Sequence, residues 1–102
     1  MEPTYDVVWP RSPLGIQAHA LAPKLSTLHG KRIGFVWDYM FRGEEIFPVL
    51  GAELQARFPD LVIVGYDVFG NIHGPDEARL VREMPATLHG NFVDAVICGN
   101  GC

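Results

Sequence analysis

The sequence lacks a membrane-spanning segment and is poor in the basic residues that bind nucleic acid. No window reaches the roughly 18–20 apolar residues of a membrane span. The opening stretch, MEPTYDVVWPRSP, does not have the basic end and apolar run of a secretory signal. Lys and Arg number 8 against 12 Asp and Glu, giving a formal net charge of −4, and the basic residues are scattered. We therefore expect no nucleic-acid partner, no membrane partner and a cytoplasmic location.

Cysteine and recognisable cofactor motifs are also scarce. The two cysteines, Cys98 and Cys102, would close only a tiny loop, which does not suggest a stapling disulfide. Cys98 is expected to be a small buried strand residue. No residues have HxxxH or CxxC spacing, so no metal site is predicted. No cofactor is evident either, because the GxGxxG, Walker-lysine and Gly-x-Ser-x-Gly patterns are missing.

The chain has room for one domain and divides into two parts. At 102 residues it falls within the size of a single domain. Proline and glycine interrupt residues 1–30, which predicts an irregular N-terminal arm lying over the core or a partner. Tyr5–Trp9 is a candidate edge strand that Pro10 would end, and Pro23–Leu28 is a candidate helical turn. Residues 31–102 are predicted to form a single α/β domain.

Strand and helix patterns alternate from Lys31 onward. Short β-rich apolar runs predict strands at Arg32–Asp38, Leu61–Asp67 and Asn91–Cys98. Apolar residues at three- and four-residue steps predict a helix over Glu44–Phe58. A second helix is expected to open at Pro75, to be kinked or ended near Pro85 and to have Gly90 as a left-handed cap.

This alternation predicts parallel strands joined by right-handed crossovers. The expected fold is a three-layer Rossmann- or flavodoxin-like β-α-β-α-β unit with the sheet order 2-1-3. The third strand is not followed by a helix that would cover the sheet. Since exposed strand edges promote association, we expect a homo-oligomer, or the arm, to cover the open sheet.

Polar and titratable residues follow each predicted strand. Ligands of open α/β sheets bind outside the carboxyl ends of the strands, near the point where strand order reverses. Asp38 and Asp67 would equally serve as strand ends that bind loop amides, and His73 as an ordinary loop residue. The candidate site-lining residues are Asp38, Tyr39, Arg42, Asp67, Asn71, His73, Asn100 and Cys102.

Three stretches resemble the UGSC-motif (seleno)protein family. They are GKRIGFVWDYMFRGEEIFPVL, FPDLVIVGYDVFGNIHGPDEA and VDAVICGNGC, and the likeness covers about residues 30–102. In that family the third strand runs into a selenocysteine (or cysteine)-Gly-Ser-Cys motif. The resemblance implies thiol or selenol redox chemistry with an unknown thiol, disulfide or small-molecule partner. It also implies that Asp38, Asn71 and His73 face the motif.

The sequence departs from the family at the motif itself. The family's motif would begin after Cys102, so Cys102 matches only the residue that precedes the reactive one. Because selenocysteine is encoded by UGA, we expect a chain truncated by a UGA read as a stop, and inactive as it stands.

Two other functions stay open. One is a non-catalytic small-molecule-binding or assembly module that uses the polar rim at the strand ends. The other is an aspartate/glutamate racemase-like enzyme, which would need two opposed cysteines. Cys98 and Cys102 lie on one turn, so this function ranks last.

Overall fold

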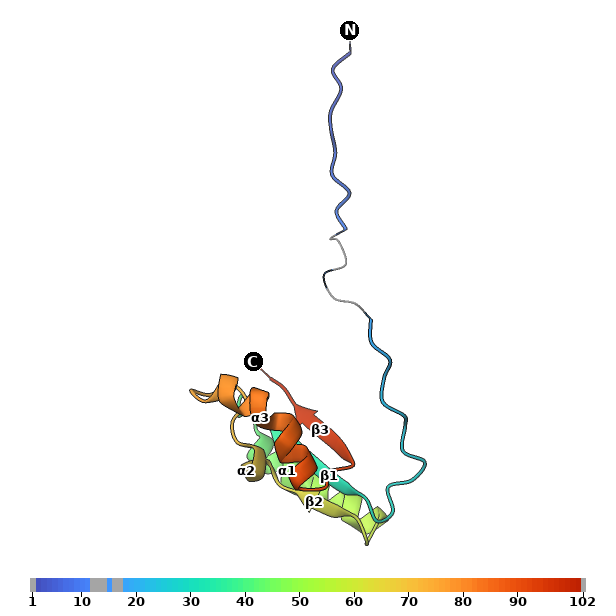
Figure 1. Ribbon diagram of the computed structural model, residues 1–102, viewed down its shortest axis with the longest axis vertical. Coiled ribbons are helices and arrows are strands. Elements are labelled where there is room, and N and C mark those ends of the chain that lie inside the picture. Colours follow the sequence, from blue (N-terminus) through green and yellow to red (C-terminus); the bar gives the residue numbers. More distant parts are fainter. Residues whose placement is uncertain (1, 12–14, 16–17, 102) are drawn as a thin grey trace.

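Three parallel strands form one open sheet in a computed structural model, which describes residues 2–11, 15 and 18–101. The strands are β1 (Arg32–Trp37), β2 (Val62–Val64) and β3 (Ala95–Gly99), in the order β2-β1-β3 (Figure 1). The predicted α/β class, parallel pairing and strand order are confirmed. Cys102, one of the candidate site residues, lies outside the described residues.

Helices on both faces bury the central strand. On one face, Phe47 of α1 (Gly43–Arg57) joins Phe35 and Trp37 of β1 in a hydrophobic cluster. On the other face, α2 (Tyr66–Phe69) contributes Phe69 to a second cluster with Val36, and α3 (Glu77–Gly90) packs against that cluster. The resulting three layers follow from the two-residue repeat of a strand, which sends successive side chains to opposite faces.

The second strand is shorter than predicted. The expected strand Leu61–Asp67 ends at Val64, and Tyr66 begins the short helix α2. In α2 the Tyr66 ring packs edge-on against Trp37, with the ring centroids 5.0 Å apart. The prediction that Asp67 ends a strand is therefore wrong: Asp67 lies in the first turn of α2.

The ends of α3 and β3 also differ from the prediction. α3 begins at Glu77 rather than Pro75, and it continues through Pro85 as far as Gly90. Gly90 is not left-handed; the positive φ, 54°, belongs to Phe92 in the turn that follows. β3 begins at Ala95, because Asp94 and the residues before it form this turn and bind the start of β1.

The N-terminal arm runs away from the domain (Figure 1). Its described residues form no helix or strand, so the predictions of an edge strand at Tyr5–Trp9 and a helical turn at Pro23–Leu28 are wrong. The apolar side chains of Tyr5 and Trp9 are exposed, and only near Leu28 does the arm pack against the core. The arm therefore does not cover the open sheet, contrary to one of the two expectations.

Candidate functional site

A cavity of about 430 Å³ lies at the carboxyl end of the sheet, on the face covered by α3. It is located between the ends of β1 and β3, where strand order reverses and α/β sheets bind their ligands. Four polar and four apolar side chains line it: Asp38, His73, Glu77 and Asn100, with Val36, Ile72, Val81 and Met84. Three of the predicted site residues, Asp38, His73 and Asn100, are thus brought together.

Asp38 ties the two strand ends of this cavity to each other. Its side chain is almost fully buried, with 8% of the residue exposed. One carboxylate oxygen accepts a hydrogen bond from the backbone N–H of Met40 at 3.0 Å, and the other accepts one from Gly101 at 2.8 Å. The loop after β1 and the turn after β3 are therefore fixed by a single carboxylate. The prediction that Asp38 binds loop amides is confirmed, and Asp38 also lines the cavity.

Asn71 builds the loop that carries His73. Its side-chain oxygen accepts a hydrogen bond from the His73 backbone N–H at 2.9 Å, an Asx turn. Asn71 also pairs with the end of β1 through an isolated bridge to Trp37. Asn71 therefore positions His73 and does not itself line the cavity.

Cys98 is exposed, so the prediction that it is buried is wrong. It lies on β3, whose face toward α3 is incompletely covered: neighbouring Val96 is 40% exposed, and α3 has no buried residue. The Cys98 thiol lies 3.6 Å from the side-chain oxygen of Asn100, toward which it donates. This contact places a free thiol beside a residue of the cavity.

Tyr39 and Arg42 lie apart from the cavity. Tyr39 stacks on Trp37 with the ring centroids 4.3 Å apart, and its φ of 63° is left-handed. Burial raises the pKa of the Tyr39 phenol, and nearby Tyr66 and Asp67 raise that pKa further. Arg42 is exposed at the start of α1, 3.7 Å from the Glu45 carboxylate. Neither side chain joins Asp38 and His73, contrary to the expectation of a single rim.

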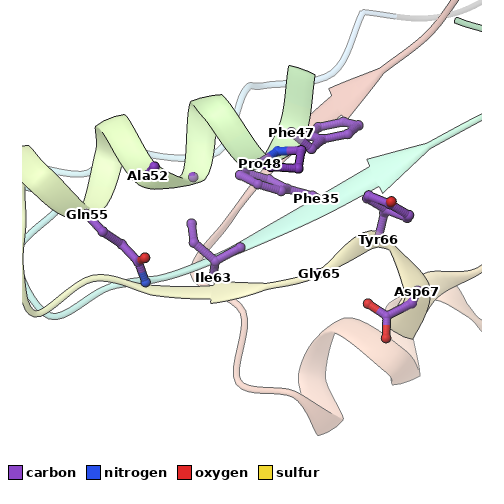
Figure 2. A pocket seen from close by; sticks show the side chains of 10 residues that line it. Phe35, Phe47, Pro48, Ala52, Gln55, Ile63, Gly65, Tyr66 and Asp67 are labelled. Atoms are coloured by element: carbon purple, nitrogen blue, oxygen red, sulfur yellow. The ribbon is translucent and has the colours of Figure 1, made fainter. Parts of the chain in front are cut away.

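Asp67 belongs to a second cavity, of about 420 Å³, on the opposite face of the sheet. Figure 2 shows this cavity between α1 and β2, with the aromatic rings of Phe35, Phe47 and Tyr66 at one end and Gln55 at the other. Asp67 lies past Gly65 and Tyr66 (Figure 2). The predicted rim is therefore divided between two faces of the sheet.

Sequence reasoning missed Glu77 as a cavity residue and Trp37 as the centre of an aromatic cluster. Glu77 lies in the first turn of α3, where a carboxylate is favoured by the helix dipole whether or not it has a function. Trp37 contacts Tyr39, Phe41 and Tyr66, and its indole N–H is buried without a hydrogen-bond partner among the described residues. The signal was the density of aromatic residues between positions 35 and 47.

The part of the chain that the structure describes contains no group of three His, Cys, Asp or Glu side chains arranged to hold a metal ion. Within the same residues, no helix is long and apolar enough to cross a membrane. Comparison with known protein families, curated proteins and solved structures found no match.

Proposed function

We propose that this α/β domain belongs to a thiol- or selenol-dependent redox protein that reacts just beyond the turn after β3. The observation that carries the proposal is the hydrogen bond from Gly101 N–H to the buried Asp38 carboxylate. It fixes the backbone immediately before Cys102, and the family resemblance places the reactive cysteine or selenocysteine directly after Cys102. Reacting groups of α/β sheets gather at this end of the strands.

The chemistry proposed is thiol–disulfide exchange or its selenol equivalent. A thiolate or selenolate attacks one sulfur of a substrate disulfide, and the other sulfur leaves as a thiolate. The second cysteine of the motif then attacks the mixed disulfide, which closes an intramolecular bond and releases the second substrate thiolate. Two electrons pass to the substrate, and an external dithiol reduces the motif again. His73 lines the cavity beside Asp38, and histidine is a residue type that can protonate a departing thiolate.

The test compares the 102-residue chain with a chain extended after Cys102 by Cys-Gly-Ser-Cys. Each is assayed with small disulfides and peroxides, with dithiothreitol as the reductant. We expect turnover only with the extended chain, and loss of turnover when the first added cysteine is replaced by serine. An extended chain that is inert toward every substrate would count strongly against the proposal.

The gene offers an independent test of the same proposal. We expect the codons that follow that of Cys102 in the gene to encode cysteine or selenocysteine and then Gly-Ser-Cys. Codons for other residues at these positions would count against the proposal.

A second candidate function is binding of a polar small molecule in the cavity beside Asp38. The observation that favours it is the cavity's lining, which places Asp38, His73 and Glu77 around an apolar floor. This function needs no reactive cysteine, so ligand-induced thermal shifts should be the same in the wild type and in Cys102→Ser. A shift that disappears in Cys102→Ser would contradict this second function.

We also propose that a second copy of the chain covers the open face of β3. Val96 and Cys98 are exposed on this strand, and the arm runs away from it. Exposed apolar residues on an edge strand favour pairing between chains.

A further inference from the structure

The cavity between α1 and β2, on the face away from Asp38, has no part in the proposed redox function. Gly51, in the middle of α1, lines this cavity without a side chain. A Cβ at Gly51 would meet Phe35 Cε2 at 3.6 Å and Ile63 Cγ1 at 3.9 Å, which are ordinary contact distances. The φ of Gly51 is not left-handed. Glycine weakens a helix interior, and here neither packing nor backbone conformation requires it. The missing side chain leaves open a space that a larger residue would fill.

One carboxylate, that of the exposed Asp67, lines this cavity at the end where Tyr66 lies. Of its ten lining residues, Asp67 alone carries a charge. Asp67 Oδ1 lies 2.7 Å from the position that a Cβ on Gly65 would take, so the carboxylate rests against a residue that has no side chain. Among the described residues, no Lys, Arg or His forms an ion pair with Asp67. Its charge is therefore available to a ligand.

Aromatic rings line the same end of the cavity. The ring centroids of Phe35 and Phe47 lie 4.8 Å apart, with the ring planes tilted by 31°. The ring centroid of Tyr66 lies 5.7 Å from that of Phe47. Aromatic faces attract cations, as does a carboxylate.

We infer that this cavity binds a small organic cation. The ammonium or amidinium group of the ligand pairs with Asp67, and its apolar body lies against Phe35 and Phe47. The volume of about 420 Å³ accommodates a molecule of one aromatic ring with a short amine arm. The formal net charge of −4 further favours a cation over an anion.

The test titrates the ¹⁵N-labelled 102-residue chain with benzylamine, and with benzyl alcohol and phenylacetate as its neutral and anionic counterparts. We expect amide shift changes centred on residues 47–55 and 63–67. Benzylamine should bind roughly tenfold more tightly than benzyl alcohol, and phenylacetate more weakly than either. Equal affinity for the amine and the alcohol, shifts centred elsewhere, or no binding of the amine would each overturn the inference.

Two variants locate the site, and a third serves as a matched control. Asp67→Asn should reduce benzylamine affinity to that of benzyl alcohol, whereas Asp76→Asn removes an exposed carboxylate outside the cavity and should leave affinity unchanged. Gly51→Leu should fill the cavity and abolish binding of both compounds. If Gly51→Leu does not fold, the comparison of Asp67→Asn with Asp76→Asn decides: equal affinities in these two variants would overturn the inference.

Discussion

Replacement of Asp38 by alanine should destabilise the domain more than replacement of any exposed carboxylate. The variant removes the acceptor of two N–H groups, those of Met40 at 3.0 Å and Gly101 at 2.8 Å. Hydrogen bonds to a charged group contribute about 1.5–3 kcal/mol each. Because Gly101 is only half-buried, water can replace part of the loss. We therefore expect the free energy of unfolding to fall by about 2–3 kcal/mol, less than the sum of the two bonds.

Urea unfolding followed by far-ultraviolet circular dichroism measures this loss, and amide hydrogen exchange reports on the two bonds directly. Asp38→Asn keeps one acceptor and should lose about half as much free energy. Asp76→Ala is the control, because its ion pair with Arg79, at 3.5 Å, is exposed and contributes about 0–1 kcal/mol. If Asp38→Ala loses no more than Asp76→Ala, and Gly101 exchanges at the wild-type rate, then Asp38 does not fix the turn after β3.

Four further predictions concern stability, ionisation and assembly. Gly51→Ala should raise the free energy of unfolding by about 0.5–1 kcal/mol in the same urea assay, because alanine favours the helix and its Cβ fits at ordinary contact distance; destabilisation would contradict this. A hydrogen bond from the Gly30 backbone lowers the pKa of Asp60 below its ordinary 3.8. The stability that the ionised Asp60 contributes is therefore present above pH 3.8 and is lost as pH falls through the lower pKa of the folded state. Between about pH 6 and pH 2, Asp60→Asn should lose less stability than the wild type, and parallel curves would refute this. Burial is the main cause that raises the pKa of Tyr39, and Tyr66 raises it further. The stability that the neutral Tyr39 contributes is therefore present below pH 10 and is lost as pH rises through the pKa of the folded state. An ultraviolet titration of the wild type should show a tyrosinate step above pH 10 that is absent from Tyr39→Phe, and identical titrations of the two proteins would refute this. Light scattering after size exclusion should give the mass of a dimer or larger assembly if a second copy covers β3, whereas a monomer mass would contradict that proposal.

The order of the elements was predictable because it depends on patterns within single segments. Arg32–Trp37 is a continuous apolar run, as a strand buried on both faces requires, and α1 shows its helical spacing directly. The length of β2 was not predictable in this way. The strand ends before Gly65, where the chain enters α2, and the Tyr66 ring of that helix packs on Trp37, a long-range contact that local sequence patterns do not reveal.

The candidate site was predicted in part, since strand order places strand ends at one edge but does not assign their side chains to a face. Asp38 and His73 were correctly expected near each other. Asp67 was grouped with them wrongly, because it lies in the turn of α2 and lines the opposite cavity. The prediction that Cys98 is buried was wrong for a similar reason. The apolar residues around it in the sequence do not reveal that α3 covers its face of β3 incompletely.

The side chains of β1 and of the loop after it are divided between the two faces of the sheet. Alternation along that strand gives Phe35 to the cavity near α1 and Val36 to the cavity near α3. After the end of β1, Asp38 lines the cavity near α3, whereas the ring of Tyr39 stacks on Trp37. The left-handed φ of 63° at Tyr39 is costly for a residue with a side chain, and such strain persists only where surrounding contacts impose it. Here two contacts impose it: the ring of Tyr39 stacks on Trp37, and the next residue, Met40, donates its backbone N–H to the Asp38 carboxylate.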